Sequence, residues 1–123
     1  MHFGNPLRKG SCADPENIRH YSEYEVAPSN EQRDLMVVLP QKDFAWSSHN
    51  ESAIKIDEKA GIWNCEIRIP LDAISATKPA AGTRWRLNLF RCDCAHKANL
   101  AWSPTLGTTF HTPDKFGVLE FSP

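Results

Sequence analysis

The clearest structural signal in the chain lies in residues 62–70, Ile62-Trp63-Asn64-Cys65-Glu66-Ile67-Arg68-Ile69-Pro70. From Trp63 to Ile69 apolar residues alternate with polar ones, which places the apolar set on one face of a strand. Pro70 ends this strand. The preceding residues 57–61 end in glycine and are typical of a hairpin loop that follows a short strand at 53–56. This stretch therefore predicts an antiparallel pair of strands.

Alternation of apolar and polar residues is also found before and after this stretch, and turn-forming residues separate the alternating segments. One helical turn is expected at 71–75, and residues 1–19, which are polar and rich in turn formers, predict an irregular lead-in to a single domain at 20–123. Short strands at such spacing with almost no helix favour an all-β fold, an antiparallel, jelly-roll-like β-sandwich. The further strands are expected at 21–26, 34–39, 84–91, 101–103 and 117–121.

Size and charge exclude several classes of protein. The 123 residues have a mass of 13.9 kDa, which is the size of one domain. Fourteen Lys and Arg against fifteen Asp and Glu give a net charge of −1, unlike a disordered acidic tail or a basic nucleic-acid arm. No apolar run approaches ~18 residues, and the first residues lack the apolar stretch of a signal peptide. We therefore expect neither a nucleic-acid nor a membrane partner.

Four cysteines leave the question of metal binding open. Their number permits two disulfides, but their spacing does not match a dense secreted framework. A zinc site is conceivable at Cys92 and Cys94 with His96, and its fourth ligand would come from Cys65, Cys12 or His111. We favour free thiols at a strand end and predict no metal from these residues.

Two carboxylates provide the best argument for an enzyme. Glu23 and Glu25 share one face of the expected strand at 21–26, with side chains ~6.5–7 Å apart. Such a pair suits general acid–base chemistry on a glycoside. No nucleophile elbow, phosphate-binding loop or zinc-protease motif accompanies it. A small glycoside hydrolase is therefore an alternative, and a protein that is not an enzyme is the expectation.

A binding module agrees better with the aromatic residues. Aromatic rings pack on the C–H-rich faces of sugars, and fixed polar groups bond the sugar hydroxyls. We expect Trp63 and Trp85 in the core, since they lie in step with aliphatic residues, and Trp102 in the core because core packing is the usual place of a tryptophan. Other aromatic and planar polar side chains fall outside this pattern: Trp46, Phe90, Phe110, Arg84, Arg86, Asn88, Glu23 and Glu25.

Five blocks in order resemble a known family. Together they span about residues 20–121 and are similar to the family 9 carbohydrate-binding module and its bacterial relatives. The blocks are Tyr24-Glu25-Val26-Ala27-Pro28, the strand at 61–70, Gly82-Thr83-Arg84-Trp85-Arg86-Leu87-Asn88-Leu89-Phe90-Arg91, Ala101-Trp102-Ser103-Pro104, and Phe110-His111-Thr112-Pro113-Asp114-Lys115-Phe116-Gly117-Val118-Leu119-Glu120-Phe121.

The resemblance implies a β-sandwich that binds sugars and has no catalysis of its own. Such domains are often attached to, or encoded beside, glycan-degrading enzymes; they are commonly exported, and some hold structural calcium. In some members two aromatic rings clamp a terminal sugar, and the position of the second ring is Phe110 here. Polar contacts are implied on the strands that carry Glu23 and Glu25, and Asn88 and Phe90.

The main departure from the family lies at residues 1–19. Family domains begin with several strands that include the first clamp tryptophan, and these residues are too few and too polar to replace them. An N-terminally truncated sandwich is thus expected, with Trp46 as one substitute for the missing ring. The predicted carbohydrate site comprises Phe110, Phe90, Asn88, Arg86, Glu23, Glu25 and Trp46.

A second alternative keeps the sandwich without the sugar. A structural or protein-interaction domain would use an exposed sheet edge to pair with another chain. The sequence leaves the glycan, the oligomeric state and the compartment open.

Overall fold

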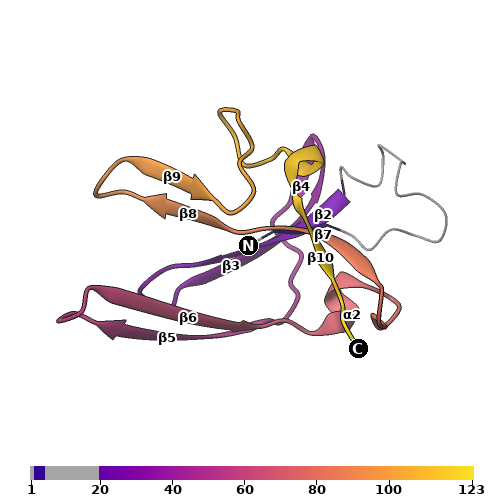
Figure 1. Cartoon of the computed structure of the whole chain (residues 1–123), viewed down its shortest axis with the longest axis horizontal. Helices are drawn as coiled ribbons and strands as arrows, with labels where there is room; N and C mark the ends of the chain where they lie inside the picture. Colours follow the sequence, from indigo (N-terminus) through magenta and orange to yellow (C-terminus); the bar gives the residue numbers. More distant parts are fainter. Residues whose placement is uncertain (1, 5–19) are drawn as a thin grey trace.

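The computed structural model describes residues 2–4 and 20–123, with the backbone alone at 2–4. Its largest element is a six-stranded antiparallel sheet in the order β10-β7-β1-β2-β3-β4 (Figure 1). The strands of this sheet are β1 (His2–Gly4), β2 (His20–Val26), β3 (Gln32–Val38), β4 (Gln41–Asp43), β7 (Arg84–Asn88) and β10 (Gly117–Glu120).

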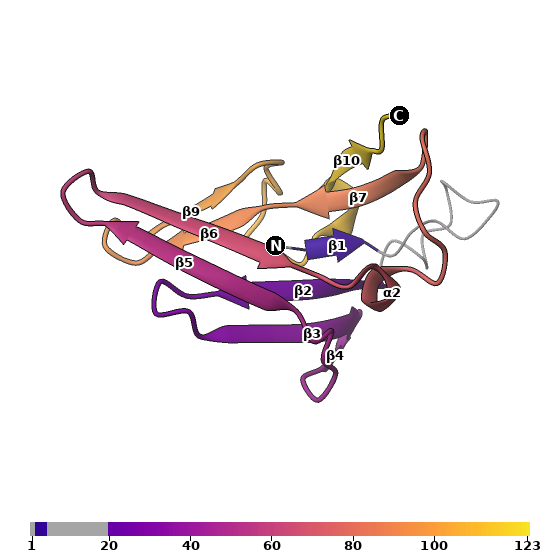
Figure 2. The ribbon, with the colours of Figure 1, turned by 90° about the horizontal axis from the view of Figure 1, so that it is seen from below.

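Two hairpins complete the strand content. β5 (Glu51–Asp57) pairs with β6 (Ile62–Arg68), and Figures 1 and 2 show this hairpin as a separate layer on one side of the large sheet. β8 (Phe90–Asp93) continues β7 after one residue and pairs with β9 (Ala98–Ala101). The helical turns are α2 (Leu71–Ile74) and the 3-10 turn η1 (Pro113–Lys115). No helix in the described part of the chain is long and apolar enough to cross a membrane.

The antiparallel all-β class is therefore confirmed. The predicted strands at 21–26, 34–39, 53–56, 63–69 and 117–121 correspond to β2, β3, β5, β6 and β10, with ends shifted by one or two residues. The helical turn corresponds to α2. The second layer beside the large sheet consists of the β5–β6 hairpin, so a jelly-roll-like sandwich stays a prediction.

The register defines the two faces of the large sheet. Tyr21 lies opposite Val37 and Glu23 opposite Leu35, so these four side chains share one face, which we call the covered face. β1 links the register of β2 to β7 and thereby adds Asn88 to this face. The other face, here the hairpin face, carries Ser22, Tyr24, Met36, Trp85 and Leu87.

One hydrophobic cluster of the core lies on the covered face, under residues 102–116, which we call the covering segment; Tyr24 and Trp85 are buried on the hairpin face. Tyr21, Leu35, Val37 and Phe116 are at most 3% exposed and form one cluster. The rings of Tyr21 and Phe116 meet edge to face with centroids 5.3 Å apart. The covering segment thus buries the apolar side chains of this face of the sheet. The alternating pattern within the strands does not indicate that this segment lies there.

Two sequence expectations need correction. Residues 1–19 were expected to be irregular, but His2–Gly4 forms a strand between β7 and β2. Three residues are too few to show an alternating pattern; residues 5–19, with Cys12, lie outside the described residues. Trp102 was expected in the core but is 57% exposed, and its ring occupies the space that a Cβ at Gly117 would need. Trp85 is buried, as expected, whereas Trp63 is half-buried.

Candidate functional site

Two polar side chains of β7 fasten the covering segment to the sheet. Asn88 is fully buried; its Nδ2 donates to the Ser103 carbonyl at 2.7 Å, and its Oδ1 accepts from the amides of Ser103 at 2.9 Å and Leu89 at 3.0 Å. Arg86 donates from Nη1 to the Phe116 carbonyl at 3.1 Å. Both residues were predicted as sugar contacts, and in the structure their hydrogen bonds position the segment that carries Phe110.

Phe90 and Phe110 meet on the covered face. Their rings stack with centroids 4.2 Å apart and planes inclined by 27°, and Phe90 also meets Phe116 edge to face at 6.2 Å. Phe90 is the apolar member of an alternating set whose other members, Arg84, Arg86 and Asn88, are polar. Its ring supports the covering segment, which explains an apolar residue at this position. Phe110 is half-buried and presents its remaining surface beside β9.

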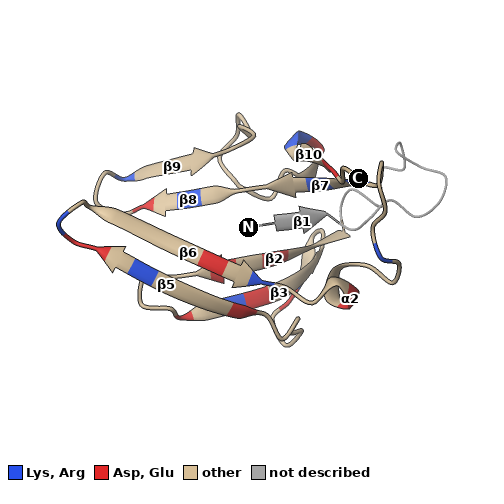
Figure 3. Ribbon diagram, turned by 60° about the horizontal axis from the view of Figure 1, so that its bottom comes forward, with Lys and Arg blue, Asp and Glu red and all other residues tan. Residues whose placement is uncertain are grey.

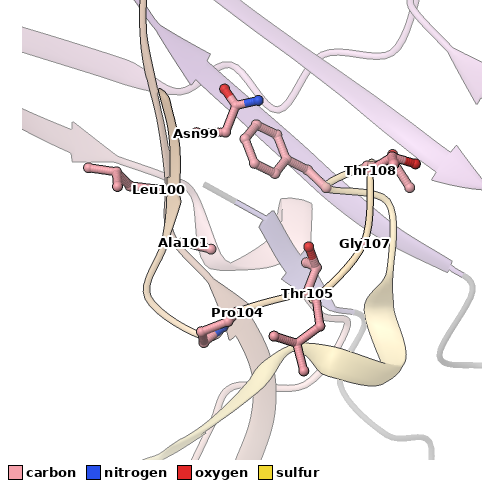
Figure 4. A pocket seen from close by; sticks show the side chains of 10 residues that line it. Asn99, Leu100, Ala101, Pro104, Thr105, Gly107 and Thr108 are labelled. Carbon is pink, nitrogen blue, oxygen red and sulfur yellow. The ribbon is translucent and has the colours of Figure 1, made fainter. Parts of the chain in front are cut away.

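That surface borders a cavity of about 330 Å³ between β9 and the covering segment. The register pairs Ala101 with Phe90 and Asn99 with Cys92, so Asn99 and Ala101 share the face of Phe90. In Figure 4, Asn99 and Thr105 approach the space from opposite sides, whereas Leu100 points away. The full lining is Asn99, Leu100, Ala101, Pro104, Thr105, Leu106, Gly107, Thr108, Thr109 and Phe110.

A hydrogen-bonded cluster follows Phe110 on the same face. The Nδ1 of His111 lies 2.7 Å from the Tyr21 hydroxyl and 3.5 Å from Oε2 of Glu23, while its Nε2 lies 2.6 Å from Nζ of Lys42. An ammonium group can only donate, so Nε2 accepts and Nδ1 carries the ring proton. The hydrogen bonds therefore assign a neutral imidazole that joins β2 to β4.

Burial dominates the electrostatics of this cluster. Burial and, after it, the neighbouring charge of Glu25 together raise the pKa of Glu23 to about 7, against the opposing charge of Lys42. Burial also lowers the pKa of His111, with Lys42 acting in the same sense and Glu25 against it. Burial, helped by Glu23, raises the pKa of Tyr21. Near neutral pH the cluster thus holds a partly protonated Glu23 beside a neutral imidazole.

The paired carboxylates lie close to one another. Glu25 raises the pKa of Glu23 through its charge and through a hydrogen-bonding interaction of the side chains, and Glu23 is only 6% exposed. In glycoside hydrolases the two carboxyl groups stand roughly 5–9.5 Å apart with the scissile bond between them. A small glycoside hydrolase that uses this pair stays an alternative prediction.

Trp46 lies away from the other predicted site residues. Its ring meets Tyr24 edge to face with centroids 6.3 Å apart, and Tyr24 belongs to the hairpin face. The turn after Trp46 is held by Asp34, whose Oδ2 accepts from the amide and hydroxyl of Ser48, both at 2.6 Å, and from Asn50 at 3.2 Å. The structure therefore brings Phe90, Phe110, Glu23 and Glu25 to one face and Trp46 to the other.

Charges and thiols add little to the site. Figure 3 shows Lys and Arg interspersed with Asp and Glu along the strands that it colours. Within the described ranges, no group of three or more His, Cys, Asp or Glu side chains is placed to hold a metal ion. Cys65, Cys92 and Cys94 are free thiols; Cys65 is half-buried, and burial raises its pKa.

Sequence reasoning missed the residues that line the cavity. The run Thr105-Leu106-Gly107-Thr108-Thr109 directly precedes Phe110, and three hydroxyl groups beside a predicted stacking ring were a usable signal. The sequence contains no such signal for Asn99 and Lys42. The register of β8–β9 places Asn99, and the register of β3–β4 places Lys42, on the side of the covering segment.

Comparison with protein-family models, with curated proteins and with solved structures gave no match to this chain. The resemblance of its five sequence blocks to family 9 carbohydrate-binding modules thus remains an interpretation of the sequence.

Proposed function

We propose that this protein binds carbohydrate without catalysis, in the cavity beside Phe110. One observation carries the proposal: a half-buried aromatic ring, backed by a second ring, borders a hollow whose polar groups are an amide and hydroxyls. Because Phe90 fixes one side of the Phe110 ring, the remaining surface is available to a ligand without rearrangement of the core.

The chemistry of the lining matches that of a sugar. Hydroxyl and amide groups both donate and accept hydrogen bonds, as sugar hydroxyls do. Asn99 and Thr105 supply such groups from opposite sides of the cavity (Figure 4). The C–H bonds of a pyranose ring suit the Phe110 face. The ten lining residues include no charged side chain, which favours a neutral sugar.

Size narrows the ligand further. A volume of about 330 Å³ lies at the lower end of the roughly 300–1,000 Å³ found for small-molecule sites. We infer that the cavity accepts one or two sugar units, either free or at the end of a longer chain. The sequence resemblance adds the expectation of a linked or co-encoded glycan-degrading enzyme as partner.

Affinity electrophoresis in neutral polysaccharides and a glycan array test the proposal. Phe110→Ala should weaken binding about five- to tenfold, since stacking on an aromatic ring contributes roughly 1–1.5 kcal/mol. Phe44→Ala is the matched control, because Phe44 is 62% exposed and its ring faces Arg33 rather than the cavity. Absence of binding to any glycan, or equal loss in both variants, would contradict the proposal.

A sugar-blind interaction domain is the second candidate. It is favoured by the apolar side chains at the loop end of β5–β6, where Ile56 and Ile62 are 51% and 50% exposed. The two side chains lie on opposite faces of the hairpin, and β5–β6 is a sheet of two strands whose outer edges can pair with another chain. Size-exclusion chromatography separates the candidates: a monomer that binds sugar supports the first, and a dimer that ignores sugar supports the second.

A further inference from the structure

We propose that His111 is the positioning residue of this site. Its hydrogen bonds to Tyr21 and Lys42 form a pH-sensitive latch, by which we mean a contact that holds the segment carrying Phe110 against the sheet. The inference deepens the proposed carbohydrate site and rests on it. In this proposal the hydrogen bonds of His111 determine whether the Phe110 ring stays beside the cavity.

The latch spans the sheet. His111 directly follows Phe110, and its two ring nitrogens bond Tyr21 on β2 at 2.7 Å and Lys42 on β4 at 2.6 Å. The backbone after Phe110 is thus fixed at two points on the covered face. Because the Phe110 ring stacks on Phe90, its place depends on where this backbone is held.

The segment before His111 transmits that constraint. The His111 amide donates to Oγ1 of Thr109 at 3.1 Å, and Oγ1 of Thr112 donates to the Thr109 carbonyl at 3.2 Å. Residues 109–112 therefore form one compact turn. When His111 moves, Thr109 and Phe110 at the cavity wall must move with it.

Protonation breaks the latch at a stated atom. In the neutral ring Nε2 accepts a hydrogen bond from the Lys42 ammonium, whereas an imidazolium donates from both nitrogens. The Nε2–H of the imidazolium then points at the Lys42 ammonium, and neither group can accept a hydrogen bond. The two positive charges repel each other, so the short contact between them is lost. Lys42 is exposed and swings to solvent, so the turn loses its anchor on β4.

The surrounding groups set the direction in which the pKa of His111 is shifted, and the net shift is downward from 6.5. The groups that face His111 are Tyr21, Glu23 and Glu25 from β2 and Lys42 from β4, and β1 adds the register position of His2 opposite Glu23. Glu25 alone favours the imidazolium, while burial and Lys42 oppose it. Glu23 takes up its proton near pH 7, so its charge is already lost when His111 begins to titrate.

Hydrogen exchange of the unliganded protein tests the latch directly. Protection factors of amides 103–116, corrected for intrinsic rates, are compared at pH 7.5 and 5.0 while NMR follows the His111 imidazole. In the wild type we expect protection of residues 109–112 to fall at least about tenfold at pH 5.0. The latch is overturned if protection stays constant while His111 titrates.

The matched variant is His111→Gln. A glutamine can accept from Lys42 and donate to Tyr21 but does not titrate, so the segment should stay protected at both pH values. Lys42→Met, at an exposed position, should already lower protection at pH 7.5. Equal loss at pH 5.0 in the wild type and in His111→Gln would overturn the role of His111.

Sugar binding is measured separately at the same two pH values. Wild-type affinity should fall about tenfold at pH 5.0, and that of His111→Gln should stay constant. If no glycan binds, the carbohydrate proposal fails while the exchange data still decide the latch. If affinity is constant while the segment is released, His111 does not position the site.

Discussion

The covered face and the β5–β6 hairpin show how little an alternating pattern says about burial. β6 has the most regular alternation in the chain, yet its inward residues Trp63, Cys65 and Ile67 are only half-buried. β2 alternates less clearly, yet four consecutive residues, 21–24, are buried. On the covered face Leu35 and Val37 are 2% and 0% exposed, whereas Ile56 on the hairpin is 51% exposed.

The difference comes from what lies over each surface. An alternating pattern assigns side chains to faces, but burial needs a second surface to cover them. The covered face receives the covering segment, which follows β3 in sequence by more than sixty residues and is held there by Asn88 and Arg86. The hairpin extends beyond the large sheet at its loop end, so that end keeps apolar side chains in water.

The first prediction removes the fastening of the covering segment. Asn88→Ala leaves the amide and carbonyl of Ser103 and the amide of Leu89 without their partner inside the fold. Each unsatisfied buried group costs roughly 1–3 kcal/mol, so the free energy of unfolding should fall by about 4 kcal/mol. Urea denaturation measures it; a loss under about 1 kcal/mol would show that the covered face does not depend on this residue. Arg84→Ala, at an exposed residue of the same strand, is the control.

The second prediction compares matched aliphatic truncations. Leu35→Ala should cost about 3 kcal/mol, because truncation of a buried leucine leaves a cavity. Ile56→Ala should cost less than about 1 kcal/mol, because its side chain already meets water. Equal losses in thermal and urea unfolding would mean that the hairpin is covered in solution by a surface absent from this fold.

The third prediction compares two aspartates that both organise turns. The Oδ2 of Asp34 accepts from Ser48 and Asn50 in the turn before β5, and these bonds outweigh burial to hold the pKa of Asp34 below its usual value. Asp57 caps only the Ala60 amide in the exposed hairpin loop. We expect Asp34→Ala to cost about 2 kcal/mol and Asp57→Ala about 0.5 kcal/mol. The reverse order in chemical unfolding would contradict the comparison.

The fold was predictable to the extent that it follows from local pattern. β2, β3, β5, β6, β10 and α2 were found because their residues alternate or meet turn formers within a few positions. β1 and β4 were not, because strands of three residues show no period, and their partners fix them. Trp102 was misplaced for a related reason: it is in step with a strand that ends at Ala101, one residue earlier.

The sequence predicted which kinds of side chain gather at the site better than it predicted what each side chain does there. Phe90 and Phe110 do meet, and Glu23 and Glu25 do share a face. That Asn88 and Arg86 bind the backbone of the chain itself could not be inferred, because their partners lie 15 and 30 residues away. Lys42 and His111 became functional candidates only through the contact between β4 and the covering segment.

The smallest expected effect is the net pH dependence of stability, because two touching groups oppose one another. Glu23 has a folded-state pKa of about 7, above its ordinary 4.5, so the folded state holds an extra proton and stability falls as pH rises from 4.5 through 7. The pKa of His111 is lowered from 6.5, so the unfolded state holds the extra proton and stability falls as pH drops below 6.5. In the wild type these slopes partly cancel between pH 5 and 6.5, and the net change should be about 1 kcal/mol or less.

Single variants separate the two slopes. Glu23→Gln should leave only the loss of stability at acidic pH, and His111→Gln only the loss toward pH 8. The double variant should be nearly flat across pH 5–8 in urea unfolding. Since Oε2 of Glu23 and Nδ1 of His111 are 3.5 Å apart, their effects should not add, and the size of that coupling measures how firmly the covering segment is held. Additive effects would mean that the two groups titrate independently and that the covered face is looser than its burial implies.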